Sequence, residues 1–201
     1  MKSAQFTHAD KLTLHDLIFH RIDEILLVAS LYDSFVLEED GRLTEQILHE
    51  YMGMNFSNAP RVWQASTAED ALTMLSRQDF DLIIVMMRIA DMDPVLFCSK
   101  IKETYPKKPV ILLAFDESEI KQLPEDFEKS TIDRVFIWSG NANVLLAIAK
   151  MFEDAMNIRR DIKKADVHCI ILIEDSPRYY SLILPMVYKE ISYQVKEMVD
   201  K

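Results

Sequence analysis

Short runs of apolar residues alternate with longer amphipathic stretches along most of the chain. Five runs have the length of buried strands, and stretches with helical periodicity separate them. The predicted strands are residues 24–29, 61–65, 81–86, 109–114 and 134–138. The predicted helices are residues 11–22, 32–51, 94–105, 117–129 and 144–156, with one more that begins after Ser66 or Thr67. Asp40-Gly41 interrupts the second of these helices and marks a kink or a break.

Strands that alternate with helices form βαβ units, so the sequence predicts an α/β protein. The architecture expected is a five-stranded, doubly wound parallel sheet of the flavodoxin-like type, with strand order 2-1-3-4-5. Ligands of such sheets bind at the carboxyl ends of the first and third strands. The residues expected at that point are Ala29, Ser30 and Met86.

The sheet region has an extension on either side. Residues 1–23 form a helical extension before a domain that spans residues 24–157, and the polar, basic residues 158–166 are a linker or continue the last helix. Residues 167–201 then read as a buried strand, a turn and a helix, which repeats the layout of Ile25 to Phe35. We interpret them as the first strand and helix of a second domain of the same class. Because one strand and one helix cannot bury a core, we expect this sequence to be a fragment of a longer protein.

Composition limits the classes of partner. The net charge of −10 argues against a nucleic-acid surface, because phosphate binding needs clustered Lys and Arg. No apolar run reaches the roughly 18 residues that a membrane span requires. Cys98 and Cys169 lack metal-ligand spacing, which indicates reduced thiols in a cytoplasmic protein. Since no nucleophile–base arrangement can be found, we expect that this fragment is not an enzyme.

Several segments together resemble the receiver domain of response regulators (CheY-like). They are Ile25–Val28, Ala65–Leu72, Phe80–Ile84, Met92-Asp93, Pro109–Leu112 and the fifth strand with its helix, within residues 24–157. In that family, two acidic residues after strand one and an aspartate that ends strand three hold Mg²⁺. A hydroxyl residue that ends strand four and a lysine that ends strand five contact the phosphoryl group.

All five of these positions carry other residue types in this sequence. The acidic pair aligns with Ala29 and Ser30, the phosphoacceptor with Met86, the hydroxyl residue with Ala114, and the lysine with Trp138. A thioether cannot accept a phosphoryl group or bind Mg²⁺. The resemblance therefore implies a pseudo-receiver without a cofactor, a regulatory module that contacts a protein partner or other domains of its own chain. Trp138 then either anchors an interface or plugs the vacated pocket.

Two other functions stay open. A working phosphorelay regulator would use a nearby carboxylate such as Asp33, Asp91 or Asp93, or would use the second domain. The simpler interpretation of these three aspartates is as helix caps or solvated loop residues. A small-ligand sensor would use an apolar pocket between strands one and three.

The C-terminal segment extends the resemblance. Glu174 and Asp175 stand where a receiver has its acidic pair, so a completed second domain would bind Mg²⁺ there. With Tyr32–Arg42, the segment Ile173–Ser181 resembles the receiver-like tandem at the N-terminus of phosphoenolpyruvate synthase-like proteins. The resemblance implies a parent that is a phosphoenolpyruvate-utilising phosphotransferase. An unpaired strand also offers an edge, which makes a homodimer through this strand–helix segment a further expectation.

Overall fold

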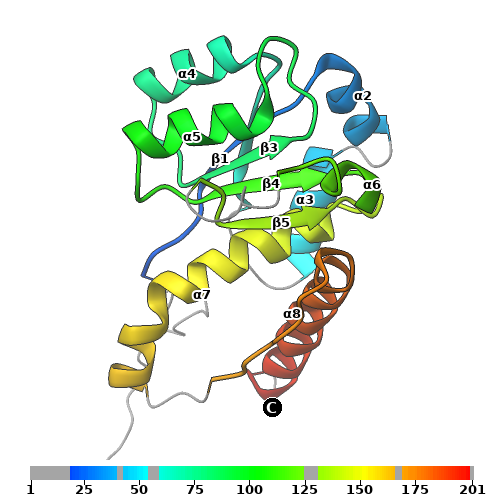
Figure 1. The fold of residues 1–201 in the computed structure, drawn as a ribbon. Helices are drawn as coiled ribbons and strands as arrows, with labels where there is room; N and C mark the ends of the chain where they lie inside the picture. The colour runs from blue at the N-terminus through cyan, green and yellow to red at the C-terminus, as the bar shows by residue number, and fades with distance from the viewer. Residues whose placement is uncertain (1–18, 40–42, 54–58, 125–130, 166–168, 200–201) are drawn as a thin grey trace, which may run out of the picture.

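The computed structural model describes residues 19–39, 43–53, 59–124, 131–165 and 169–199 (Figure 1). They form a five-stranded, all-parallel sheet with helices on both faces. The strand order is β2-β1-β3-β4-β5, which confirms the predicted fold. The strands are β1 (Glu24–Val28), β2 (Arg61–Ala65), β3 (Leu82–Met86), β4 (Val110–Ala114) and β5 (Arg134–Ile137). The helices are α2 (Leu31–Glu39), α3 (Leu43–Gly53), α4 (Ala68–Arg77), α5 (Pro94–Thr104), α6 (Glu117–Ile120), α7 (Asn143–Ala165) and α8 (Pro177–Val199).

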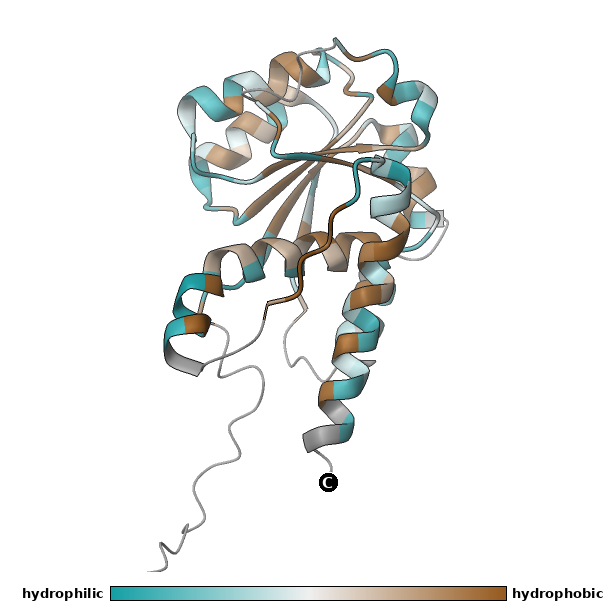
Figure 2. Cartoon of the chain, turned by 60° about the horizontal axis from the view of Figure 1, so that its bottom comes forward, coloured by the Kyte–Doolittle hydropathy of each residue, from teal (hydrophilic) through white to brown (hydrophobic). Residues whose placement is uncertain are grey.

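Each face of the sheet carries its own core. Every residue of β3 and β4 is buried, as expected for central strands of a parallel sheet. Because successive side chains of a strand point to opposite faces, Leu27 and Ile84 pack with α3, α7 and α8, while Leu26 and Ile83 pack with α4 and α5. Figure 2 shows the apolar strands at the centre and the polar residues on the outer helices.

Local signals set the starts of two helices. Thr67 accepts a hydrogen bond from the Asp70 backbone N–H at 3.0 Å, so Thr67 rather than Ser66 caps α4. Asp93 caps α5, with Pro94 at the first helical position, as predicted.

Two predicted helices differ from those observed, and a third lies mostly outside the described residues. The helix expected over 32–51 is two helices, α2 and α3, and the Asp40-Gly41 interruption between them lies outside the described residues. The helix expected over 117–129 is helical only at the short α6 in its described part, and residues 125–129 lie outside the described residues. Most of the helix expected over 11–22 also lies outside the described residues, and residues 19–23 are not helical.

The basic stretch after residue 157 continues α7 to Ala165, so it extends the helix that precedes it. Buried Asn157 anchors this part of the helix, because its amide donates to the His20 carbonyl oxygen and accepts from the His20 N–H.

The strand predicted after residue 166 is not formed. Residues 169–176 belong to no strand in the described parts of the chain, and Ile170, Ile171 and Ile173 are 73%, 81% and 88% exposed. A strand needs a neighbour for its backbone hydrogen bonds, and α8 covers the outer edge of β5, the nearest sheet edge. The prediction was wrong here because an apolar run favours burial but does not supply the partner strand.

The C-terminal helix packs as part of the same core as the sheet. Tyr180 and Leu184 are buried beside β5 and α7, and the Ser181 hydroxyl accepts a hydrogen bond from the Ile137 N–H at 2.8 Å. The Tyr188 hydroxyl donates to the Asp154 carboxylate at 2.7 Å. The bond to Ile137 satisfies a backbone group that an edge strand would otherwise leave unpaired.

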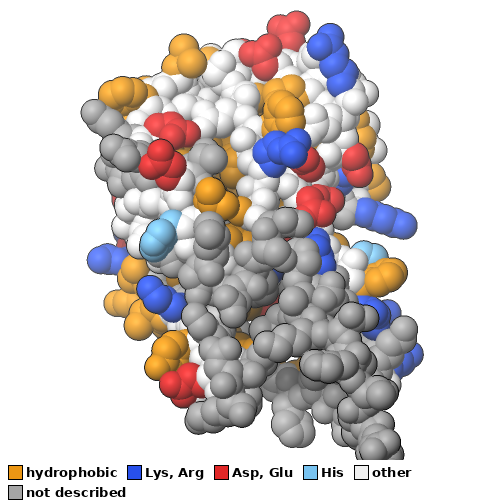
Figure 3. Space-filling model, turned by 180° about the vertical axis from the view of Figure 1, so that it is seen from behind, with side chains coloured by type: hydrophobic (Ala, Val, Ile, Leu, Met, Phe, Trp, Pro, Cys, Tyr) orange, Lys and Arg blue, Asp and Glu red, His pale blue; other side chains and the backbone are white. Residues whose placement is uncertain are grey.

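The face opposite to that of Figure 1 shows acidic and basic side chains interspersed among apolar ones (Figure 3). None of the described helices has the length and apolar content needed to span a membrane.

Candidate functional site

The positions that the sequence singled out come together at the carboxyl end of the sheet. Ala29, Met86 and Ala114 have no exposed surface, and Trp138 is 5% exposed. The Trp138 N–H donates to the Ala114 carbonyl oxygen at 2.7 Å, which extends the β4–β5 pairing by one residue. Ala29, Met86 and Trp138 belong to one apolar cluster, and the indole N–H makes no hydrogen bond within the described residues. Trp138 therefore plugs this end of the sheet rather than standing out as an exposed anchor.

Ser30 begins a helix at this end of the sheet. Its hydroxyl accepts from the Asp33 N–H at 3.1 Å, and its carbonyl oxygen accepts from the Ser34 N–H at 2.8 Å. These are the bonds of an N-cap residue, so Ser30 caps α2. The Ser30 N–H also donates to the Arg88 carbonyl oxygen at 3.0 Å, which ties the start of α2 to the loop after β3.

Asp33 is the ionisable side chain most deeply enclosed near this point. It is 1% exposed, and within the described residues neither carboxylate oxygen accepts a hydrogen bond. Arg88 Nε lies 3.7 Å from Asp33 Oδ1. The position in the first turn of α2 also favours a negative charge. The sequence predicted a cap or a solvated carboxylate for Asp33, and neither description fits this buried side chain.

Arg88 links three elements around the site. Besides Asp33, its guanidinium contacts the Glu119 carboxylate of α6 at 3.1 Å and lies 5.8 Å from the centre of the Phe115 ring. Glu119 in turn accepts from the Phe115 N–H at 2.7 Å. The loop after β3 is thus tied to α2 on one side and to α6 on the other. Sequence reasoning missed Arg88, because a single arginine in a loop carries no pattern.

The other two candidate carboxylates cap helices. Asp91 accepts from the Ala68 N–H at 2.7 Å and from the Glu69 N–H at 3.2 Å, at the start of α4. These backbone hydrogen bonds, that from Ala68 above all, lower the pKa of Asp91 below its usual value. Asp93 accepts from the Leu96 N–H at 2.9 Å. The capping interpretation therefore fits both residues.

Glu174 and Asp175 lie away from this end of the sheet. With Asp133 and Arg134 they line a cleft of about 270 Å³ at the amino end of β5. Glu174 accepts from the Ser176 N–H at 2.9 Å, while Asp175 is exposed. Within the described residues, no group of three or more His, Cys, Asp or Glu side chains is placed to hold a metal ion.

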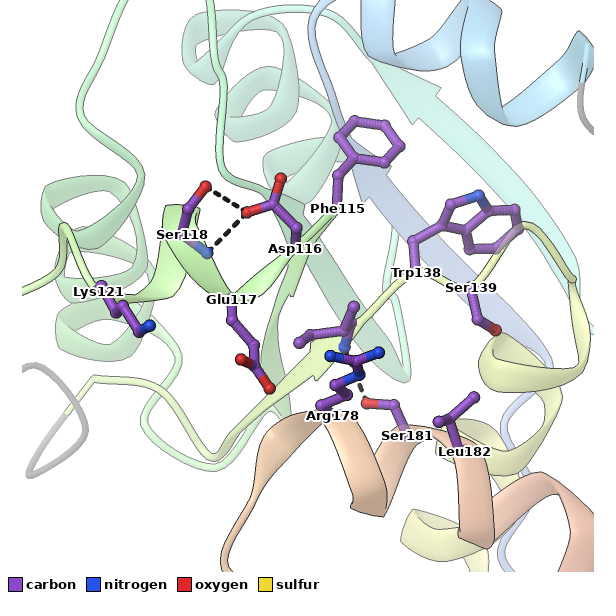
Figure 4. A pocket seen from close by; sticks show the side chains of 11 residues that line it. Phe115, Asp116, Glu117, Ser118, Lys121, Trp138, Ser139, Arg178, Ser181 and Leu182 are labelled. Atoms are coloured by element: carbon purple, nitrogen blue, oxygen red, sulfur yellow. Dashed lines mark hydrogen bonds between the residues drawn. The ribbon is translucent and has the colours of Figure 1, made fainter.

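A larger cleft of about 610 Å³ lies between the loop after β4, the end of β5 and the first turns of α8 (Figure 4). Lys121, Glu117 and Arg178 surround it, and Trp138 forms part of its wall. This cleft does not lie at the β1–β3 point where a ligand pocket was predicted. Ala29 and Met86 are fully buried there, so their own side chains occupy that point.

Comparison with known proteins gives matches only at the level of structure. No family model matches the chain, and no curated protein matches it. A CheY-like response regulator receiver domain protein from Methanospirillum hungatei JF-1 matches with a TM-score of 0.51 and 18% identity, over 69% of this chain and 98% of that one.

Two further solved receivers match at slightly lower TM-scores. The signal receiver domain of an HD domain-containing protein from Pseudomonas fluorescens Pf-5 has a TM-score of 0.49 and 23% identity, over 70% of this chain and 94% of that one. Response regulator TrrA from Thermotoga maritima has a TM-score of 0.49 and 18% identity, over 65% of this chain and 98% of that one. Given the strand order and the first of these matches, the chain has the fold of a response-regulator receiver domain.

Proposed function

We propose that residues 24–157 are a receiver-like regulatory module that is not phosphorylated and that acts through contact with a protein partner or with other domains of its own chain. The observation that carries the proposal is Met86. Its side chain is fully buried at the carboxyl end of β3, where a phosphoacceptor would have to face the solvent. Ala29, Ala114 and Trp138 surround that end of the sheet without a carboxylate, hydroxyl or ammonium group.

Phosphoryl transfer depends on electrostatic stabilisation of the charge on the transferring group. A receiver-type reaction needs oxygen ligands for a divalent cation, a nucleophilic carboxylate and a cationic side chain, all reachable from water. Asp91 and Asp93 are engaged as helix caps. The apolar side chains at the other positions would supply none of these groups.

Arg88 supports the second half of the proposal, action through contact with a partner, because it holds the contact surface in one conformation. Its contacts with Asp33 and Glu119 join the loop after β3 to α2 and to α6 without any added group. We infer that this bridge keeps the surface formed by this loop and the two helices in a constant shape, so a partner binds it without a phosphorylation signal.

The alternative of a working phosphorelay regulator needs a carboxylate near this end of the sheet, and among Asp33, Asp91 and Asp93 only Asp33 caps no helix, although its side chain is 1% exposed. Asp33 has a carboxylate that accepts no hydrogen bond within the described residues, and a cation lies nearby. The resemblance to phosphoenolpyruvate synthase-like tandems adds a proposal for a longer parent protein, whose completed second domain would bind Mg²⁺ through Glu174 and Asp175.

Beryllofluoride with Mg²⁺ tests the proposal, because it mimics a phosphoryl group on an aspartate. We expect no binding heat by calorimetry, and no change in the fluorescence of Trp138 in a Trp63→Phe variant. A conventional receiver, titrated in the same buffer, is the positive control. Saturable, Mg²⁺-dependent binding that Asp33→Asn abolishes would contradict the proposal and support the alternative.

A further inference from the structure

The helix α8 has two apolar faces, and only one of them is covered. Tyr180 and Leu184 pack on β5 and α7. On the opposite face, Tyr179, Leu182, Met186 and Tyr193 are 57%, 44%, 69% and 56% exposed. Their spacing of three, four and seven residues places them in one stripe along the helix, here called the outer stripe. Figure 2 shows apolar residues recurring along the full length of α8.

A second exposed apolar segment precedes α8 in the chain, and it is separate from the outer stripe. Ile170, Ile171 and Ile173 are exposed. Ile170 lines a cleft with Tyr180 and Leu184, on the side of α8 that faces α7. Single exposed apolar residues are ordinary on a protein surface, but a row of them along one helix face marks a contact surface. The outer stripe is therefore the apolar surface of α8 that a partner would cover.

The charge distribution indicates what kind of partner fits. Residues 143–201 contain nine Lys and Arg and nine Asp and Glu, so this part of the chain is neutral. The whole net charge of −10 is carried by residues 1–142. Two copies of the chain repel each other through their acidic domains, but not through α8. The neutral end is thus the place where a second copy can approach at the lowest electrostatic cost.

We propose that the outer stripe of α8 is the contact between two copies of this chain, related by a two-fold axis. In an antiparallel pairing centred at the level of Leu184, Leu182 of one copy faces Met186 of the other. The same alignment brings Arg178 of one copy near Glu190 of the other, which adds opposite charges at the rim of the contact. This inference rests on the proposed function as a protein-contact module and names one partner of it.

The test is the molar mass of the intact chain, measured by light scattering across a concentration series. A reductant is present because the thiol of Cys169 is exposed. We expect a dimer for the native chain, and a monomer for the Leu182→Glu/Met186→Glu double variant. The matched control is Leu96→Glu, since this leucine of α5 is also exposed, at 51%, and should leave the dimer intact. Circular dichroism confirms that all three proteins are folded.

Three outcomes overturn the inference: a native chain that is monomeric at every concentration, a dimer that survives in the double variant, and a dimer that Leu96→Glu abolishes. A native monomer that binds a different protein through the outer stripe also contradicts it. Beryllofluoride binding, measured on the same preparations, separates this failure from failure of the proposed function, because neither result depends on the other.

Discussion

At the scale of single residues, the side chains at the carboxyl end of the sheet decide what the site can do. Met86 is part of the core, and Asp33 is a buried carboxylate whose nearest charged group is Arg88. The alignment of Met86 with an acceptor position could be predicted from the sequence, because β3 is a continuous apolar run. The burial of Asp33 could not be predicted, since it depends on a contact with residue 88 across the fold.

The variant Met86→Asp measures how well the protein tolerates a carboxylate at this position. A charge placed in the apolar cluster without a partner should destabilise the protein by about 3–5 kcal/mol. Met86→Leu, which conserves volume, should cost less than about 1.5 kcal/mol. Urea denaturation measures both variants. Equal stabilities of the two variants would mean that polar groups or water reach this position.

A double-mutant cycle measures the contact between Arg88 and Asp33. Arg88→Ala leaves a buried carboxylate without its cation, and we expect a loss of up to about 1 kcal/mol, because the arginine is exposed and the pair is therefore screened. Asp33→Asn in the Arg88→Ala background should recover most of that loss. Arg77→Ala, at an exposed arginine of α4, is the control. Additive effects of Arg88→Ala and Asp33→Asn would show that the two side chains do not interact.

At the scale of helices and strands, features set by neighbouring residues could be predicted from the sequence, and features set by long-range contacts could not. The cap Asp93 could be predicted from the sequence, and the start of α4 could be placed at Ser66 or Thr67, because each cap bonds within its own helical turn. The cap that Asp91 provides to α4 joins two separate loops, and the segment at 169–173 lacks a strand neighbour. Neither feature could be predicted from the sequence, because each depends on what lies nearby in the folded chain.

The lowered pKa of Asp91 predicts a pH dependence of stability. A carboxylate with a lowered folded-state pKa stabilises the protein above its unfolded pKa of about 3.9, and the contribution is lost as the pH falls through the lower, folded value. Asp91→Asn should therefore be less stable than the native protein at neutral pH. The difference should shrink in acid. Thermal melting at several pH values measures it, and a difference that grows below pH 4, about the unfolded pKa, would contradict this role.

The contact between α8 and β5 includes one buried hydrogen bond, beside the apolar packing of Tyr180 and Leu184. Ser181→Ala leaves the Ile137 N–H without its acceptor, and we expect a loss of about 1–3 kcal/mol. Ser192→Ala in the same helix is the control and should have little effect. Hydrogen exchange at Ile137 should accelerate in the Ser181 variant only. Unchanged exchange would show that the edge of β5 is protected by other contacts.

At the scale of the whole molecule, the five-stranded sheet has the receiver strand order, and buried apolar side chains lie at the carboxyl ends of its central strands. The strand order follows from the sequence, because repeated βαβ units leave few topologies. The position of α8 could not be predicted from the sequence, since its apolar residues are equally compatible with the core of a second domain. Arg88 and the buried cluster around Met86 together support a module whose surface does not depend on phosphorylation.

Intact mass spectrometry after incubation with acetyl phosphate and Mg²⁺ tests this account most directly. A conventional receiver that gains one phosphoryl group under the same conditions serves as the standard. We predict no mass increase for this chain, either native or as the Arg88→Ala variant, which gives freer access to Asp33. A stoichiometric, hydroxylamine-sensitive phosphoryl adduct within residues 24–157 would contradict the account.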